Sequence, residues 1–324
     1  ATTKVKEALV REFLFADDCA LVAHSEAALQ RLADCFSSAA KAFGLTVSIK
    51  KTEAMLQPAP NTNRPRPCIT IDGVQLNAVD DFCYLGSCLA SSGSIDKEIA
   101  RRLSKASCSF GRFWTRVWGE RGIRIATKVA VYRAIVLPTL LYGWETWTCY
   151  RRHIKQRDQF HLRCLRKVMQ ISWEDRITDR EVLRRAGLPG DEVLLMSTQL
   201  RWSGHVMRLD DDRLPKQLFC SELVRGKRHQ GGQTKRYKDA LKVNLRSCDT
   251  PVIGGTNLAA DRSSWRASIR TGVQKFEEGR LDLLDKKRQA RKERRPSPAD
   301  TVACLVCGRN SASEFGLQSH LRRH

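Results

Sequence analysis

Two adjacent carboxylates interrupt an apolar stretch near the start of the chain, in Phe13-Leu14-Phe15-Ala16-Asp17-Asp18-Cys19-Ala20-Leu21-Val22. Short runs rich in Phe, Leu and Val are typical of β-strands, and Asp tolerates tight turns. The stretch therefore predicts a β-hairpin over residues 9–23 that presents Asp17 and Asp18 at its tip. Such a pair of carboxylates suits Mg²⁺, a hard cation that prefers oxygen ligands. The alternative is a solvated turn that binds no metal.

The residues that follow this hairpin predict a small mixed region of helix and strands. Ser25 is a good helix N-cap, apolar residues then recur at helical spacing up to Phe43, and Gly44 suits the helix end. Asp72-Gly73 predicts a type I′ turn within a hairpin over 68–76. We expect further strands at 45–49, 54–56 and 82–87.

From about residue 94 onward the pattern becomes helical. We expect helices over 94–113, 124–147, 151–169, 181–186, 190–207 and 258–276, with Pro138 as a break in the second. The spacing in the first two helices predicts a buried face that includes Ile99, Phe110, Tyr132, Ile135 and Leu140. It predicts an outer face that carries Arg101, Arg102, Lys105 and Arg112.

The composition favours a polyanionic partner. The 324 residues suffice for two or three domains, and the net charge of +22 points to nucleic acid. No apolar run approaches the roughly 20 residues that span a bilayer, so we expect no membrane partner. Ten of the 12 cysteines show no paired spacing, and there is no signal-peptide pattern. We therefore expect a nuclear or cytoplasmic protein that is not secreted; the oligomeric state is unknown.

Two segments concentrate the positive charge. Residues 225–238 hold six Lys and Arg residues without an acid, and residues 286–295 hold seven. We predict contact with RNA or DNA, or a nuclear localisation signal in the second segment. The alternative is a solvated or linking segment. The candidate residues are Lys227, Arg228, Lys235, Arg236, Lys286, Lys287, Arg288, Arg291 and Lys292.

The last 21 residues hold a metal-ligand pattern, Cys304-x2-Cys307-x12-His320-x3-His324. Two thiolates and two imidazoles satisfy tetrahedral Zn²⁺, and the spacing is that of a ββα zinc finger. The residues at the base-reading positions, Ser313, Gly316 and Ser319, have short side chains or none. We therefore expect contact with a nucleic-acid backbone, RNA or another part of the chain rather than a sequence code.

Several motifs together resemble one family, the reverse transcriptases of non-LTR (LINE-type) retrotransposons. Phe15-Ala16-Asp17-Asp18 resembles their catalytic box, and a terminal Cys/His zinc motif is also usual there. The resemblance covers nearly the whole chain in the family's order. The further motifs are the next palm motif at 44–53, the primer grip at 84–87, the thumb at 137–147 and the region after it at 200–208.

The resemblance implies an α+β fold and RNA-directed DNA polymerase chemistry. It divides the chain into a partial palm of antiparallel hairpins and one helix (1–92), a helical thumb (93–175), a basic helical connector and linker (176–298) and a ββα zinc finger (299–324). It makes Asp17 and Asp18 ligands of Mg²⁺ and places Lys51 near the triphosphate. Ser48 departs from the asparagine of the family pattern.

The resemblance also shows what is missing. In the family, the fingers and a third metal-binding aspartate precede the catalytic box, and only 12 residues precede Phe13 here. We therefore expect a chain that begins inside a domain and is inactive as a polymerase alone. The alternatives are a non-enzymatic zinc-finger protein that binds RNA or DNA, derived from a retrotransposon, and a gene fragment without a stable fold.

Overall fold

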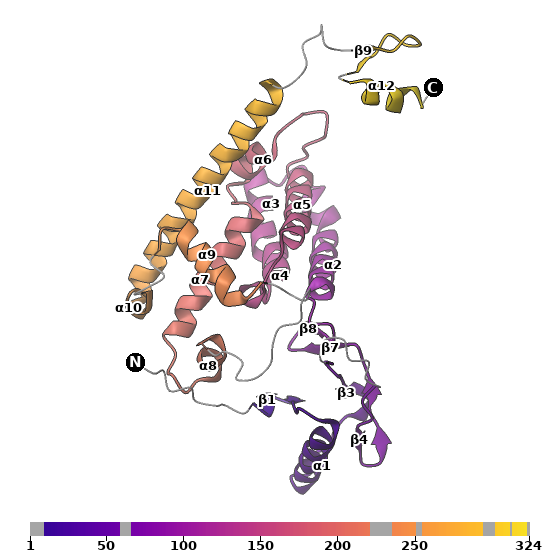
Figure 1. Ribbon diagram of the computed structural model, residues 1–324, viewed down its shortest axis with the longest axis vertical. Coiled ribbons are helices and arrows are strands. Elements are labelled where there is room, and N and C mark those ends of the chain that lie inside the picture. Colours follow the sequence, from indigo (N-terminus) through magenta and orange to yellow (C-terminus); the bar gives the residue numbers. More distant parts are fainter. Residues whose placement is uncertain are drawn as a thin grey trace. The chain divides into compact units, whose positions relative to one another are not determined.

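The computed structural model describes residues 10–58, 66–220, 235–250, 255–293, 302–311 and 313–322. The chain forms two compact units, Ala1–Val273 and Gln274–His324. Figure 1 shows helices together with short paired strands, so the fold is of the expected α+β class.

The predicted N-terminal hairpin is confirmed, with its turn moved by one residue. Strands β1 (Glu12–Phe15) and β2 (Asp18–Leu21) pair antiparallel, and Phe15 lies opposite Asp18. The turn therefore consists of Ala16 and Asp17, and Asp18 is the first residue of a strand. Ala16 adopts a left-handed φ of 50°, a conformation that costs a residue with a Cβ atom about 1 kcal/mol.

Helix α1 (Glu26–Ala42) confirms both predicted end signals. Ser25 accepts a hydrogen bond from the backbone N–H of Ala28 at 3.3 Å, and Gly44 follows the helix with a φ of 72°. The strand predicted at 45–49 is wrong. Leu45 is exposed, and Ile49–Lys51 form a 3₁₀ turn, η1. The hydroxyl of Thr52, directly after the turn, donates to the carbonyl of Ser48, directly before it.

Three further strand pairs complete this region. Strand β3 (Glu53–Ala54) pairs parallel with β6 (Asn77–Ala78), one residue earlier than the strand predicted at 54–56. Strands β4 (Thr70–Ile71) and β5 (Val74–Gln75) confirm the predicted hairpin, and the positive φ angles of Asp72 and Gly73 are those of a type I′ turn. A small core gathers beneath them, formed by Ala33, Ala54, Ile69, Ile71 and Leu76.

The single strand predicted at 82–87 is wrong, because the chain reverses inside it. Strands β7 (Asp81–Tyr84) and β8 (Ser87–Ala90) form a hairpin. Its two turn residues, Leu85 and Gly86, have φ angles of 47° and 78°. A leucine rarely adopts such an angle, so the sequence carries only half of the usual turn signal.

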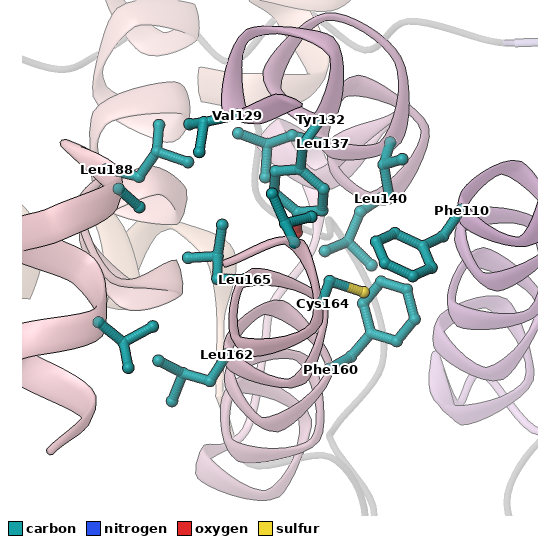
Figure 2. Close-up of a cluster of buried hydrophobic side chains, with 14 of the residues drawn as sticks. Phe110, Val129, Tyr132, Leu137, Leu140, Phe160, Leu162, Cys164, Leu165 and Leu188 are labelled. Carbon is teal, nitrogen blue, oxygen red and sulfur yellow. The ribbon is translucent and has the colours of Figure 1, made fainter. Parts of the chain in front are cut away.

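The helices that follow pack around the largest core. They are α2 (Asp96–Arg112), α3 (Ile125–Val131), α4 (Leu137–Leu141), α5 (Arg151–Val168), α6 (Asp179–Ala186) and α7 (Asp191–Met207). Figure 2 shows apolar side chains from several of these helices pointing toward one another, among them Phe110 of α2, Leu140 of α4 and Leu165 of α5. The predicted helical region is thus present.

A wide π turn at Tyr132–Val136, η3, joins α3 to α4 and explains one error. Pro138 stands in the first turn of α4 and has no N–H to donate, so the break predicted there takes this form. A π turn holds more residues per turn than an α-helix, so its side chains point in other directions than helical spacing predicts. Ile135, which lies in this turn and was predicted to be buried, is therefore 37% exposed.

Arg102 was predicted on the outer face of its helix and is instead buried. Its Nε donates to Glu98 at 2.7 Å, and its NH2 donates to the carbonyl of Gly86 in the β7–β8 turn. The guanidinium also lies over the ring of Tyr142, 4.3 Å from its centre. A tertiary partner that periodicity does not reveal therefore holds this charge inside.

Four more helices follow, α8 (Leu214–Cys220), α9 (Tyr237–Ser247), α10 (Gly255–Ala260) and α11 (Arg262–Glu293). The helix predicted at 258–276 is divided at Asp261, whose carboxylate accepts hydrogen bonds from the N–H groups of Ser263 and Ser264. Beyond it, β9 (Val302–Ala303) and β10 (Asn310–Ser311) pair antiparallel, and α12 (Glu314–Leu321) follows. None of the described helices has the length and apolar composition needed to cross a membrane.

Candidate functional site

The C-terminal cysteines and one histidine meet in space. Cys304 and Cys307 lie on the turn between β9 and β10, where the N–H of Gly308 donates to the carbonyl of Cys304 at 2.8 Å. His320 comes from α12, whose N-cap Ser313 accepts a hydrogen bond from the N–H of Gly316. The ligand atoms of Cys304, Cys307 and His320 all lie within 4.8 Å of one another, and Cys307 Sγ is 3.1 Å from His320 Nε2.

This donor set fits a metal ion such as zinc. The backbone N–H of Cys307 points at the Cys304 sulfur and, with that of Val306, lowers the pKa of this thiol and favours the thiolate that binds metal. Two sulfurs and one imidazole are three of the four ligands that tetrahedral Zn²⁺ takes. The predicted fourth ligand, His324, lies outside the described residues.

Asp17 and Asp18 are both exposed at the end of the first hairpin. Within the described residues, the only group of three or more His, Cys, Asp or Glu side chains close enough to share a metal is the C-terminal one. No third carboxylate joins the aspartates there, so the structure does not support the predicted Mg²⁺ site. Lys51 ends the 3₁₀ turn η1 with an exposed side chain, and its predicted role near a triphosphate stays a prediction.

Hydrogen bonds connect the stretches that carry the family resemblance. The hydroxyl of Tyr84, in the stretch 84–87, donates at 3.0 Å to the carbonyl of Phe13, two residues before the stretch 15–18. The hydroxyl of Tyr142, in the stretch 137–147, donates to the carbonyl of Leu85 at 3.0 Å. The first hairpin, the β7–β8 turn and the end of α4 therefore form one connected series.

The series continues to α7, at the residue before the last of these stretches. Gln199 on α7 donates to the carbonyl of Trp147 at 2.8 Å, and the hydroxyl of Tyr237 donates to that of Glu145 at 2.7 Å. The indole N–H of Trp265 donates to the carbonyl of Leu200 at 3.0 Å. Sequence reasoning missed these linking residues. Their only signal is a polar group on an otherwise apolar helical face, such as Gln199 between Leu195 and Leu200.

The predicted basic residues are exposed wherever the structure describes their side chains. Lys235 and Arg236 precede α9, and the ammonium of Lys235 lies 5.6 Å from the ring centre of Tyr150. Lys286, Lys287, Arg288 and Arg291 lie on α11. Lys227, Arg228 and the side chain of Lys292 lie outside the described part. Contact of these residues with nucleic acid stays a prediction.

One known protein is similar to most of the chain. A protein of Caenorhabditis elegans named as transposon-derived is 28% identical over 267 residues, which cover 79% of this chain and 94% of that protein. The match supports an origin in a transposon. No protein-family model matches the chain, and no solved structure matches it at a significant level.

Proposed function

We propose that this chain is a zinc-binding and nucleic-acid-binding part of a retrotransposon reverse transcriptase, with the late palm, thumb and a C-terminal C2H2 zinc finger. The observation that carries the proposal is the convergence of Cys304, Cys307 and His320 on one point. Zinc-binding modules of this kind commonly serve nucleic-acid recognition. The transposon-derived relative and the charge of +22 support the same function.

Cys304, Cys307, His320 and His324 would hold one zinc ion, which would fix the β9–β10 turn against α12. Metal analysis of the full chain, purified under reducing conditions, is expected to find one zinc per chain. Cys304→Ser should lose it, because three ligands of a tetrahedral site bind zinc weakly. Cys35→Ser, at an exposed cysteine outside the group, should retain it. A wild-type chain that contains no zinc would contradict the proposal.

We further propose that the chain alone does not polymerise. Asp17 and Asp18 lack a third carboxylate among the described residues, and Mg²⁺ prefers more oxygen ligands than two exposed side chains hold in place. In a primer-extension assay with an RNA template, Mg²⁺ and dNTPs, the wild type should extend no more than Asp17→Asn/Asp18→Asn. Extension that the wild type supports and this variant abolishes would overturn the proposal.

A second candidate is a non-enzymatic zinc-finger protein that binds RNA or DNA. The exposed, incomplete carboxylate pair favours it. A polymerase thumb should prefer a primer–template with a recessed 3′ end, whereas a general binder should not distinguish this end from the separate strands or a blunt duplex. Competition between these ligands, measured at one salt concentration because phosphate contacts depend on salt, separates the two candidates.

A further inference from the structure

A cavity of about 520 Å³ lies among α7, the 3₁₀ turn η4 (Trp144–Thr146) and the start of α11. Four arginines line it: Arg201 from α7, Arg208 directly after the end of α7, and Arg262 and Arg266 from α11. Arg201 and Arg208 are seven residues apart, and Arg262 and Arg266 are four residues apart. Both spacings place the two side chains of a pair on the same helical face. Two helices distant in sequence therefore direct four positive charges toward one space.

A close helix contact holds the two walls of this cavity. Trp265 of α11 is 4% exposed, and its indole N–H donates to the carbonyl of Leu200 on α7. Gly204 permits this approach, since a Cβ atom built there would lie 2.1 Å from the indole nitrogen. The contact buries one tryptophan as a fixed anchor and leaves the neighbouring arginines on the open side.

The charges in the cavity are poorly balanced. Within the described part of the chain, Arg201, Arg262 and Arg266 form no ion pair, and Arg208 donates only to the carbonyl of Ala259, at 2.8 Å. The carboxylate of Asp261 is adjacent in sequence, but it is engaged in capping α11. Among the residues that the structure describes, Glu145 is the only acidic side chain that lines the cavity.

Repulsion among these arginines lowers the pKa of Arg266. The pKa of Arg266 lies below its usual value, first because of the charge on Arg262, next because of partial desolvation, and further because of Arg201 and Arg208. A cluster of like charges is relieved by a bound anion. Guanidinium groups match phosphate in geometry because they donate parallel pairs of hydrogen bonds to it.

We propose that this cavity binds a phosphate group of single-stranded nucleic acid, held between the arginines of α7 and α11. The choice of nucleic acid rests on the proposed function. The volume is that of a small-ligand site and suits one nucleotide. Trp202 also lines the cavity, half-buried and braced edge-on by Phe219 and Tyr237, each with ring centres 6.0 Å away. Such an aromatic wall suits the sugar or a stacked base of a nucleotide. The carboxylate side chains of an acidic peptide have no flat ring to place against it.

The test measures binding of a fluorescein-labelled single strand of about 15 nucleotides to the full chain by anisotropy at several salt concentrations. Arg262→Gln/Arg266→Gln changes two exposed side chains and should preserve the fold. We expect about tenfold or greater weakening and a salt slope reduced by about 1, as for one or two lost phosphate contacts. Arg246→Gln/Arg270→Gln removes the same charge from exposed positions outside the cavity and should have less than a third of this effect.

Glu145→Gln gives an independent readout of opposite sign. Removing the one carboxylate of the cavity should strengthen binding by about threefold, because it no longer repels phosphate. Equal weakening by the two arginine pairs would overturn the proposal in favour of general surface charge. Equal competition by a blunt duplex, or by polyglutamate at matched charge, would also overturn it.

The same experiment distinguishes failure of the cavity from failure of the proposed function. If the wild type binds and the cavity variant binds equally well, the cavity proposal fails and the proposed function stands. If the wild type binds no nucleic acid, the proposed function fails, and 5′-AMP is then titrated into a chain labelled with 5-fluorotryptophan. Shifts in the fluorine signals of Trp202 and Trp265 would support a phosphate site, and unchanged signals would overturn it.

Discussion

The strand region, residues 10–92, and the helical region, residues 93–250, are held together in different ways. Among the described residues of the strand region every sheet has two strands, and Leu14 and Phe15 of the first hairpin are each 62% exposed. In the helical region large side chains such as Tyr132, Leu140 and Leu165 are 0% exposed within one continuous core. Isolated two-stranded hairpins are marginal in water, whereas buried apolar area stabilises a fold directly.

This difference indicates that the helical region is the more rigid of the two. Within the strand region, the hydroxyl of Tyr84 holds the first hairpin to β7. Tyr142 and Arg102 then join the β7–β8 turn to the helical region. A metal site needs ligands fixed to within a fraction of an ångström. The exposed aspartate hairpin does not offer such a frame, whereas the cavity between α7 and α11 rests on well-packed helices.

The largest expected effect tests the helical core against the hairpin. Leu165→Ala should lower the free energy of unfolding by about 3 kcal/mol, because it leaves a cavity among fully buried neighbours. Leu14→Ala should change it by less than about 0.5 kcal/mol, since most of that side chain already contacts water. Urea denaturation followed by far-ultraviolet circular dichroism measures both.

The contrast between the two regions would be contradicted if Leu14→Ala and Leu165→Ala lowered the free energy of unfolding equally. A loss of about 2 kcal/mol or more on Leu14→Ala would mean that the hairpin is covered in solution, for example by a second copy of the chain. A denaturation midpoint that depends on protein concentration would then identify self-association.

The helices were predictable because their signals are local. Ser25 and Gly44 mark the two ends of α1, and the 3.6-residue spacing of Ile99, Ala106 and Phe110 marks the buried face of α2. The errors arise where tertiary partners decide. Arg102 is buried because it donates a hydrogen bond to the carbonyl of Gly86 in the β7–β8 turn. The spacing of residues along the helix does not indicate that acceptor.

The candidate sites divide in the same way. Cys304, Cys307 and His320 meet because a hairpin and one helix within a short segment suffice to bring them together. The arginine cavity draws on η4, α7 and α11, and its walls depend on the fit of Trp265 against Gly204. Such a site emerges only from the packed structure.

A smaller effect is expected from acid on the helical core. His161 is fully buried, the hydroxyl of Tyr132 lies 2.8 Å from its Nδ1, and burial lowers its pKa to about 4 from 6.5. The unfolded chain therefore binds a proton more readily than the folded one, so this group should cost about 2 kcal/mol of stability as the pH falls from 7 to about 5. Asp191, whose pKa burial raises to about 6, acts in the opposite sense.

The readout is the difference in pH dependence between the wild type and His161→Leu. The variant should have a lower free energy of unfolding than the wild type at pH 7. Its free energy of unfolding should not fall by the further amount of about 2 kcal/mol that the wild type loses between pH 7 and about 5. Parallel curves for the wild type and His161→Leu would show that His161 does not remain neutral and buried.

The smallest effect comes from one substitution made in both regions. Gly73 has a φ of 75° with no atom within 4 Å of an added Cβ, so Gly73→Ala should cost about 1 kcal/mol from backbone conformation alone. Gly111 lies in α2 with equal space around it, and Gly111→Ala should instead stabilise the chain by about 0.5 kcal/mol. Amide hydrogen exchange locates each effect, in β4 and β5 for the first and in α2 for the second. Equal signs for the two variants would contradict the left-handed turn at Asp72-Gly73, and with it the hairpin that closes the small core of the strand region.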